Sequence, residues 1–257
     1  KHAFLVNASR VAIDNGTIVD LYTNSSLVNF TFKVWGSTDA TLELMGGLFV
    51  DTRADSGAVY VGNASDSAKK NGTLIVRDGF RCVCDWVFLQ TGADGAVEIF
   101  GGDITNAKYG NLFNFMGTAD GACASPRKIT GGTFKATNDG RFLFPYSVGV
   151  EVCGGTYSKE VRDKNGALTL PDGYTVRKNA DNTYTVMKEN TVRSAKLTVG
   201  SDLTIDFYAA VGAEIAAKGN VGMAVTMNGK QTMLHGTEDT TTGLYVFSFT
   251  GITPQCM

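Results

Sequence analysis

Acidic side chains recur at one position of a repeated pattern in this sequence, and they are the first residues that could do chemistry. The position four residues before each of six regularly spaced glycines holds, in order, Ala12, Glu43, Ile75, Glu98, Lys128 and Glu151. Paired carboxylates can cleave glycosidic bonds. However, Lys128 separates Glu98 from Glu151, and opposite charges on neighbouring strands form ion pairs. We therefore interpret the series as a solvated, salt-bridged ladder and predict no catalytic residue in it.

Aromatic and acidic residues mix in the stretch from residue 85 to residue 109. Asp85 adjoins Trp86, Asp103 follows a Gly-Gly pair, and Tyr109 follows six residues later. An indole or phenol ring can stack on a sugar, with an acid nearby to orient it. We predict that Trp86, Asp103 and Tyr109 are ligand-binding residues. The alternative is ordinary surface aspartates beside a half-buried tryptophan.

Histidine and cysteine offer little for catalysis or metal binding. The chain has only His2 and His235, and no nucleophile-elbow, phosphate-loop or dinucleotide motif occurs. The cysteines are odd in number and irregular in spacing: Cys82, Cys84, Cys123, Cys153 and Cys256. We expect buried free thiols, while a bridge from Cys153 to a neighbouring repeat stays open. The sequence predicts no metal site, no cofactor and no enzymatic activity.

The elements that position these residues follow from a repeat built on glycine. The anchor glycines recur at intervals of 23 to 32 residues and are Gly16, Gly47, Gly79, Gly102, Gly132 and Gly155. The residues five and three before each anchor and two after it are apolar, except Arg81 and Arg127. Each repeat is thus typical of a strand, a glycine corner and a second strand. We expect Ile99, Ile129 and Val152 to contact one another in the interior.

Strands without intervening helices favour an all-β fold, as do 31 glycines and only 4 prolines. We predict a right-handed parallel β-helix over residues 1–160, a solenoid with one repeat stacked about every 4.8 Å. Residues 161–190 are typical of a capping hairpin and linker. Residues 191–257 predict a small β-sandwich-like module with a turn at Asn228 and Gly229, and we expect that module to be truncated.

Composition restricts the partners. With 23 basic and 25 acidic side chains the net charge is −2, which disfavours a nucleic-acid partner because phosphates require a basic face. No run of 18 apolar residues occurs, so we expect no membrane insertion. The chain begins at "KHAFLVNASR" without an initiator Met or a signal segment, and we expect it to be part of a longer precursor.

Several of these segments resemble a known family. "ITGGTF", "VCGGTYSKEV" and "LPDGYTVRKNADNTYTV" resemble the GGTFS-type β-helix repeats, with their closing hairpin, of large secreted or cell-wall-attached proteins of anaerobic Gram-positive gut bacteria. "SAKLTVGSDLTIDFYAAV" and "YVFSFTGITPQCM" are similar to the β-rich module that often follows. The resemblance covers residues 97–257 well and the first 96 more loosely. It implies an extracellular or cell-wall location and an adhesin-like or stalk-like role, and it carries no catalytic signature.

Three functions remain open on this basis. The leading one is a non-enzymatic surface module, an adhesin-like rod that presents a binding surface to a host protein or glycan. The second is a carbohydrate-binding or polysaccharide-cleaving β-helix, which acids clustered with Arg or Lys on adjacent repeats would favour. The third is a surface antigen recognised by host immunity.

Overall fold

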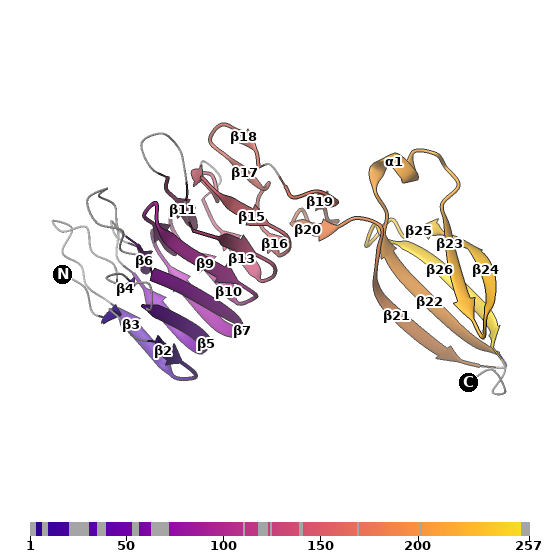
Figure 1. Ribbon diagram of the computed structural model, residues 1–257, viewed down its shortest axis with the longest axis horizontal. Helices are drawn as coiled ribbons and strands as arrows, with labels where there is room; N and C mark the ends of the chain where they lie inside the picture. Colours follow the sequence, from indigo (N-terminus) through magenta and orange to yellow (C-terminus); the bar gives the residue numbers. More distant parts are fainter. Residues whose placement is uncertain are drawn as a thin grey trace. The chain divides into compact units, whose positions relative to one another are not determined.

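The computed structural model describes residues 4–6, 10–20, 31–34, 40–52, 57–62, 72–109, 111–117, 123, 125–138, 141–168, 170–200 and 202–252. This part of the chain is almost entirely β, and its one helix is the short α1 (Ala213–Ala216) (Figure 1). The chain divides into two compact units. Unit 1 comprises residues 1–171 and 182–186, and unit 2 comprises residues 172–181 and 187–257.

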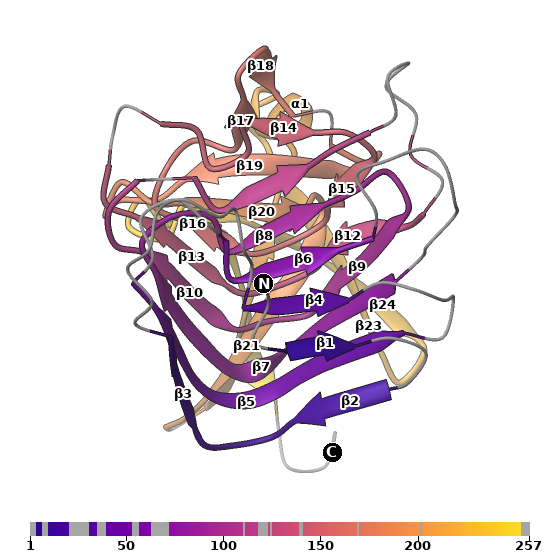
Figure 2. The same ribbon diagram turned by 90° about the vertical axis from the view of Figure 1, so that its left-hand side faces the viewer.

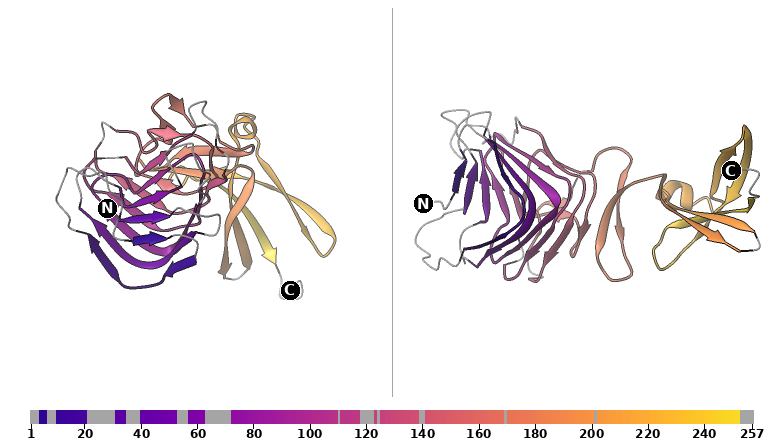
Figure 3. Two further views of the ribbon diagram at one scale, coloured as in Figure 1. Left: turned by 60° about the vertical axis from the view of Figure 1, so that its left-hand side comes forward. Right: turned by 90° about the horizontal axis from the view of Figure 1, so that it is seen from below.

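A curved sheet of parallel strands, the long sheet, carries the glycine corners of unit 1 (Figure 2). Its parallel strands are β2 (Arg10–Ile13), β3 (Thr17–Asp20), β5 (Thr41–Asp51), β7 (Gly72–Cys84), β9 (Gly95–Ile99), β10 (Asp103–Asn106), β12 (Arg127–Ile129), β13 (Thr133–Ala136), β15 (Val150–Val152) and β16 (Thr156–Tyr157). Each strand pairs in parallel with a strand of an adjacent repeat. β9, for example, lies between β7 of the preceding repeat and β12 of the following one. The strands therefore stack repeat on repeat (Figure 3).

A second parallel sheet, the short sheet, contains one strand from each repeat. Its order is β1 (Phe4–Val6), β4 (Phe32–Val34), β6 (Val59–Val61), β8 (Leu89–Thr91), β11 (Phe113–Phe115) and β14 (Tyr146–Ser147). The chain then forms an antiparallel hairpin of β17 (Arg162–Asp163) and β18 (Gly166–Ala167). Buried aromatic rings from both sheets fill the interior of unit 1, because alternate residues of each strand point inward.

The predicted interior register is confirmed. Ile129 is the Cα partner of both Ile99 and Val152, and all three side chains are buried. The pairing of the outward series is confirmed as well, since each member pairs in turn with the next from Ala12 to Glu151, but Glu43 is buried and the ladder is not solvated there. Before the glycine corners, the alternation along the strands was therefore sufficient to assign partners.

The anchor assigned to the third repeat was wrong by one residue. A register shift between Leu44 and Gly46 pairs Gly79 with Gly46, so that Phe80 stands opposite the anchor Gly47. Cys82, rather than Arg81, consequently occupies the inward position between Phe49 and Ile104, and it is buried. Arg81 faces outward and is exposed, as the charge of its side chain requires.

Arg127, the other polar exception in the repeat, does occupy an inward position. Its side chain is only 2 % exposed, and its guanidinium donates hydrogen bonds to the carbonyl oxygens of Gly95 (3.1 Å), Gly92 (2.6 Å) and Val148 (2.7 Å). A fixed fork of five N–H donors suits several backbone acceptors at once. Arg127 thus satisfies carbonyl groups that an apolar residue would leave without this donor.

The Gly-Gly pairs combine two different steric requirements, as the pair in the fifth repeat shows. A Cβ on Gly131 would overlap the carbonyl oxygen of Phe100 in the preceding repeat. Gly132 has a φ of 111°, a conformation that residues with a Cβ rarely adopt. Close stacking therefore selects the first glycine, and the corner selects the second.

Residues after 171 form the remaining strands. They are β19 (Tyr174–Lys178), β20 (Tyr184–Lys188), β21 (Thr191–Val199), β22 (Leu203–Ala210), β23 (Gly222–Met227), β24 (Lys230–His235), β25 (Thr237–Glu238) and β26 (Tyr245–Ile252). β20 pairs antiparallel with β16 through Thr185 and Tyr184.

In unit 2 the antiparallel order is β21-β22-β26-β25, and β23 and β24 form a separate hairpin. A small core holds these strands together and consists of Ala209, Val221, Leu234 and Phe247. The predicted turn between β23 and β24 is confirmed, because Met227 pairs with Lys230 and the two residues between them, Asn228 and Gly229, have φ values of 48° and 76°.

Candidate functional site

The outward ladder of the long sheet forms an ion pair where the sequence predicted one. Lys128 Nζ lies 3.6 Å from Glu151 Oε2, and both side chains are at least half exposed. An exposed pair of this kind contributes little to stability, typically about 0–1 kcal/mol. Glu98 is the Cα partner of Lys128 on the other side, so a cation separates Glu98 from Glu151.

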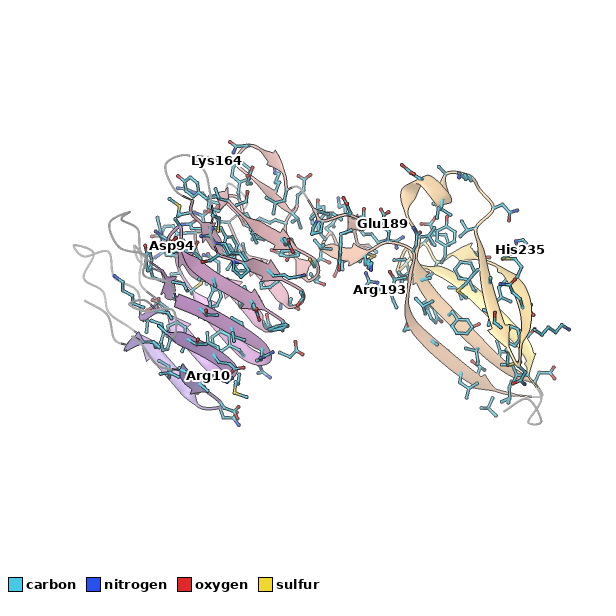
Figure 4. The ribbon with its side chains drawn as sticks, viewed as in Figure 1. Arg10, Asp94, Lys164, Glu189, Arg193 and His235 are labelled. Carbon is cyan, nitrogen blue, oxygen red and sulfur yellow. The ribbon has the colours of Figure 1, made fainter. Side chains whose placement is uncertain are left out.

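Glu43 is the buried member of the same ladder. Its side chain is 3 % exposed and accepts hydrogen bonds from Arg10 and from Arg77, whose Nε lies 2.9 Å from Oε1. Figure 4 shows Arg10 on β2, at the N-terminal edge of the long sheet. The hydrogen bonds from Arg10 and then Arg77 lower the pKa of Glu43 below its ordinary value. A carboxylate held ionised in this way is a poor general acid, and it ties three repeats together instead.

Unit 1 should lose stability when Glu43 is protonated. The pKa of Glu43 is lower in the folded chain than in the unfolded chain, where it is about 4.3. The ion pairs therefore contribute fully above that unfolded value, and their contribution is lost as the pH falls through the lower folded pKa. Urea midpoints of wild type and Glu43→Gln should differ at about pH 7 and converge as the pH falls through the folded pKa of Glu43.

Glu98→Gln is the matched control for this prediction, because it removes an exposed carboxylate from the same ladder. Its urea midpoint should follow the wild type at each pH. A Glu43→Gln difference that stays constant across the pH range would contradict the ion-pair account.

Two of the three predicted ligand-binding residues lie together. The rings of Trp86 and Tyr109 pack edge to face with centroids 4.6 Å apart, and both side chains are half-buried. They follow β7 and β10, which end at neighbouring positions because Cys84 and Asn106 are Cα partners. The carboxyl ends of parallel strands thus bring together two rings that are 23 residues apart in the chain.

Asn106, which sequence reasoning did not select, holds this pair in place. Its side chain is fully buried, and its amide nitrogen donates to the carbonyl oxygens of Trp86 and of Asn111. Its Oδ1 accepts hydrogen bonds from the backbone N–H groups of Lys108 (3.1 Å) and Tyr109 (2.8 Å). One amide therefore fixes the backbone at both aromatic residues. The signal was a polar residue at an inward position of the alternating pattern.

Asp103 does not join the aromatic pair. It begins β10, three residues before Asn106, which places it on the order of 10 Å along the extended strand. Its carboxylate lies 3.6 Å from Lys135 Nζ on the next repeat, and both side chains are about half exposed. Asp103 therefore belongs to a surface ion pair, and of the three predicted residues only Trp86 and Tyr109 lie together.

The structure describes four of the five cysteines and one of the two histidines. Cys82, Cys84, Cys123 and Cys153 are free thiols, but only Cys82 and Cys84 are buried, so the expected burial is wrong for Cys123 and Cys153. Burial raises the pKa of the Cys82 thiol well above its ordinary value. Cys256 and His2 lie outside the described residues. His235 Nδ1 lies 3.1 Å from Asn220 Oδ1 in unit 2.

The described part of the chain also contains no cluster of ligating side chains and no membrane-spanning helix. Within it, no group of three or more His, Cys, Asp or Glu side chains could hold a metal ion. No helix there is sufficiently long and apolar to cross a bilayer. Comparison of the chain with protein-family models, with curated proteins and with solved structures finds no match. The function proposed for the residues around Trp86 and Tyr109 therefore depends on their own geometry.

Proposed function

We propose that the chain is a non-enzymatic, adhesin-like module that acts outside the cell or at the cell surface and binds glycan through Trp86 and Tyr109. Residues 1–160 would form a right-handed parallel β-helix, residues 161–190 its capping hairpin and linker, and residues 191–257 a β-sandwich-like module. Two parallel sheets, in which strands of successive repeats pair with one another, support this architecture. The right-handed bias of parallel crossovers supports the handedness.

The observation that carries the binding proposal is the preorganised aromatic pair. Trp86 and Tyr109 keep part of each ring accessible, while buried Asn106 fixes the backbone of both residues. Rings offer large contact area with an apolar face, which suits the C–H groups of a sugar ring. A fixed pair loses little conformational entropy when it binds, so the same contacts give higher affinity. Lys108 Nζ lies 5.4 Å from the Tyr109 centroid and adds a donor beside the rings.

Trp86→Ala should weaken glycan binding about tenfold or more, because central aromatic contacts commonly carry over 1.4 kcal/mol of binding energy. The purified chain would be titrated with plant and mucosal polysaccharides, and the best ligand would be remeasured with the variant. Released reducing ends would be followed in the same samples.

Phe100→Ala is the matched control for this titration. Phe100 is 40 % exposed, packs on Arg77 and precedes the Gly-Gly corner at a distance from the aromatic pair. Its loss should leave the affinity within about twofold. Equal weakening by both variants would contradict a site at Trp86, and turnover abolished by Glu98→Gln or Asp103→Asn would contradict a non-enzymatic module.

A further inference from the structure

A basic pocket lies at the last repeat of unit 1, away from the residues used above. It has a volume of about 310 Å³, within the range of small-molecule sites. Its walls come from three segments, residues 141–143, residues 158–162 and the start of β20 near Tyr184. Because β20 pairs with β16, the end of the repeat array and the following strand together enclose this space.

Cations predominate among the charged side chains that line the pocket. The lining contains three cations, Arg141, Lys159 and Arg162, and one carboxylate, Glu160, whose Oε2 lies 3.4 Å from Arg162 Nε. Lys159 Nζ donates to the backbone oxygen of Arg141 at 3.3 Å, which places the Lys159 ammonium beside the Arg141 backbone. The whole chain has a net charge of −2, so this local excess of two positive charges is not a property of its composition.

The lining also contains rings and neutral hydrogen-bonding groups. The Arg162 guanidinium lies 5.0 Å from the Phe142 centroid, which orients its planar fork. Tyr184 and Asn182 contribute a hydroxyl and an amide, whereas the Ser158 hydroxyl is hydrogen-bonded to the Ala136 backbone. Guanidinium groups match carboxylate and sulfate oxygens bidentately, whereas rings and hydroxyls suit the body of a sugar.

The pocket and the aromatic pair occupy the same edge of unit 1. The strands β7, β10, β13 and β16 are parallel and in register, so the residues that follow them emerge side by side. Thr137 Oγ1 donates to the Ala107 carbonyl at 2.7 Å, which joins the segment after β13 to the segment before Tyr109. This edge therefore continues from the aromatic pair towards the pocket, repeat by repeat.

The geometry points to a second binding site in this pocket, for a saccharide that carries a sulfate or carboxylate group. Arg141 and Arg162 bind the anionic group, Lys159 adds charge, and Phe142 and Tyr184 contact the sugar ring. Glu160 opposes the ligand, because its carboxylate repels the anion and competes for Arg162. None of the residues proposed to bind glycan around Trp86 and Tyr109 lines this pocket.

Titrations would compare a chondroitin sulfate oligosaccharide, an unsulfated oligogalacturonate and a neutral cello-oligosaccharide, with polyglutamate as a peptide anion. We expect at least one acidic saccharide to bind about tenfold more tightly than the neutral one, with affinity falling as salt rises. Desulfated chondroitin, which keeps the carboxylates and the same sugars, identifies the contribution of sulfate when it is compared with the sulfated oligosaccharide. Polyglutamate bound as tightly as the saccharides would overturn the proposal in favour of a peptide ligand.

Three variants test the residues. Arg162→Gln should weaken acidic-saccharide binding about tenfold, whereas Glu160→Gln should strengthen it, a gain that a disturbed fold would not produce. Lys135→Gln is the control, because it removes a half-exposed cation from the same unit outside the pocket. Equal weakening by Lys135→Gln, or no change with Glu160→Gln, would overturn the pocket assignment. Trp86→Ala separately tests the first surface, so the two proposals fail independently.

Discussion

Truncation of Phe113 to alanine is expected to lower the free energy of unfolding of unit 1 by about 3–5 kcal/mol, the usual range for a buried phenylalanine. The Phe113 side chain is fully buried on β11, at the centre of the aromatic interior. Its ring centroid lies 5.1 Å from that of Phe144, 5.2 Å from that of Phe134 and 5.8 Å from that of Phe115. The two sheets cannot close on the cavity without disturbing these partners.

Urea unfolding followed by tryptophan fluorescence would measure this loss. Both tryptophans, Trp35 and Trp86, lie in unit 1, so the signal reports that unit. Phe113→Leu should lose less because it fills most of the space, and Phe100→Ala should lose little because Phe100 is partly exposed. A Phe113→Ala loss under about 1 kcal/mol would contradict a packed interior between the sheets.

Arg127→Met is expected to cost about 3–5 kcal/mol, although methionine is similar in length and apolar. The substitution removes donors from the carbonyl oxygens of Gly92, Gly95 and Val148. Each buried acceptor left without its partner costs roughly 1–3 kcal/mol, partly recovered where water enters. Desolvation lowers the pKa of Arg127, and its hydrogen bonds compensate the charged form for this burial.

Arg81→Met is the matched control, since it makes the same chemical change on the exposed face of β7. It should alter the free energy of unfolding by no more than about 0.5 kcal/mol. Arg127→Lys should fall between the two, because one ammonium group cannot reach three carbonyls in the geometry of the guanidinium fork. Equal effects of Arg127→Met and Arg81→Met would show that the inward hydrogen bonds do not stabilise the unit.

The sequence allowed the faces of most strands to be predicted but not the third corner. The recurrence of glycine once per repeat located the corners at Gly47, Gly102, Gly132 and Gly155, all of which have positive φ. In the third repeat Phe80 stands opposite Gly47. The corner there is made by a local register shift between Leu44 and Gly46 and has no glycine opposite Gly47. A bulge depends on the neighbouring strand, so one repeat read alone does not reveal it.

Local sequence alone determined the all-β character, the alternation that places Ile129 inward and the turn at Asn228 and Gly229, because side-chain period and allowed φ are properties of a few adjacent residues. Tertiary structure decided the rest. Stacking in register brought Trp86 to Tyr109 but left Asp103 beside Lys135, and it gave Arg127 its carbonyl partners. These contacts join segments 20 or more residues apart, so only the pairing of whole strands sets their distances.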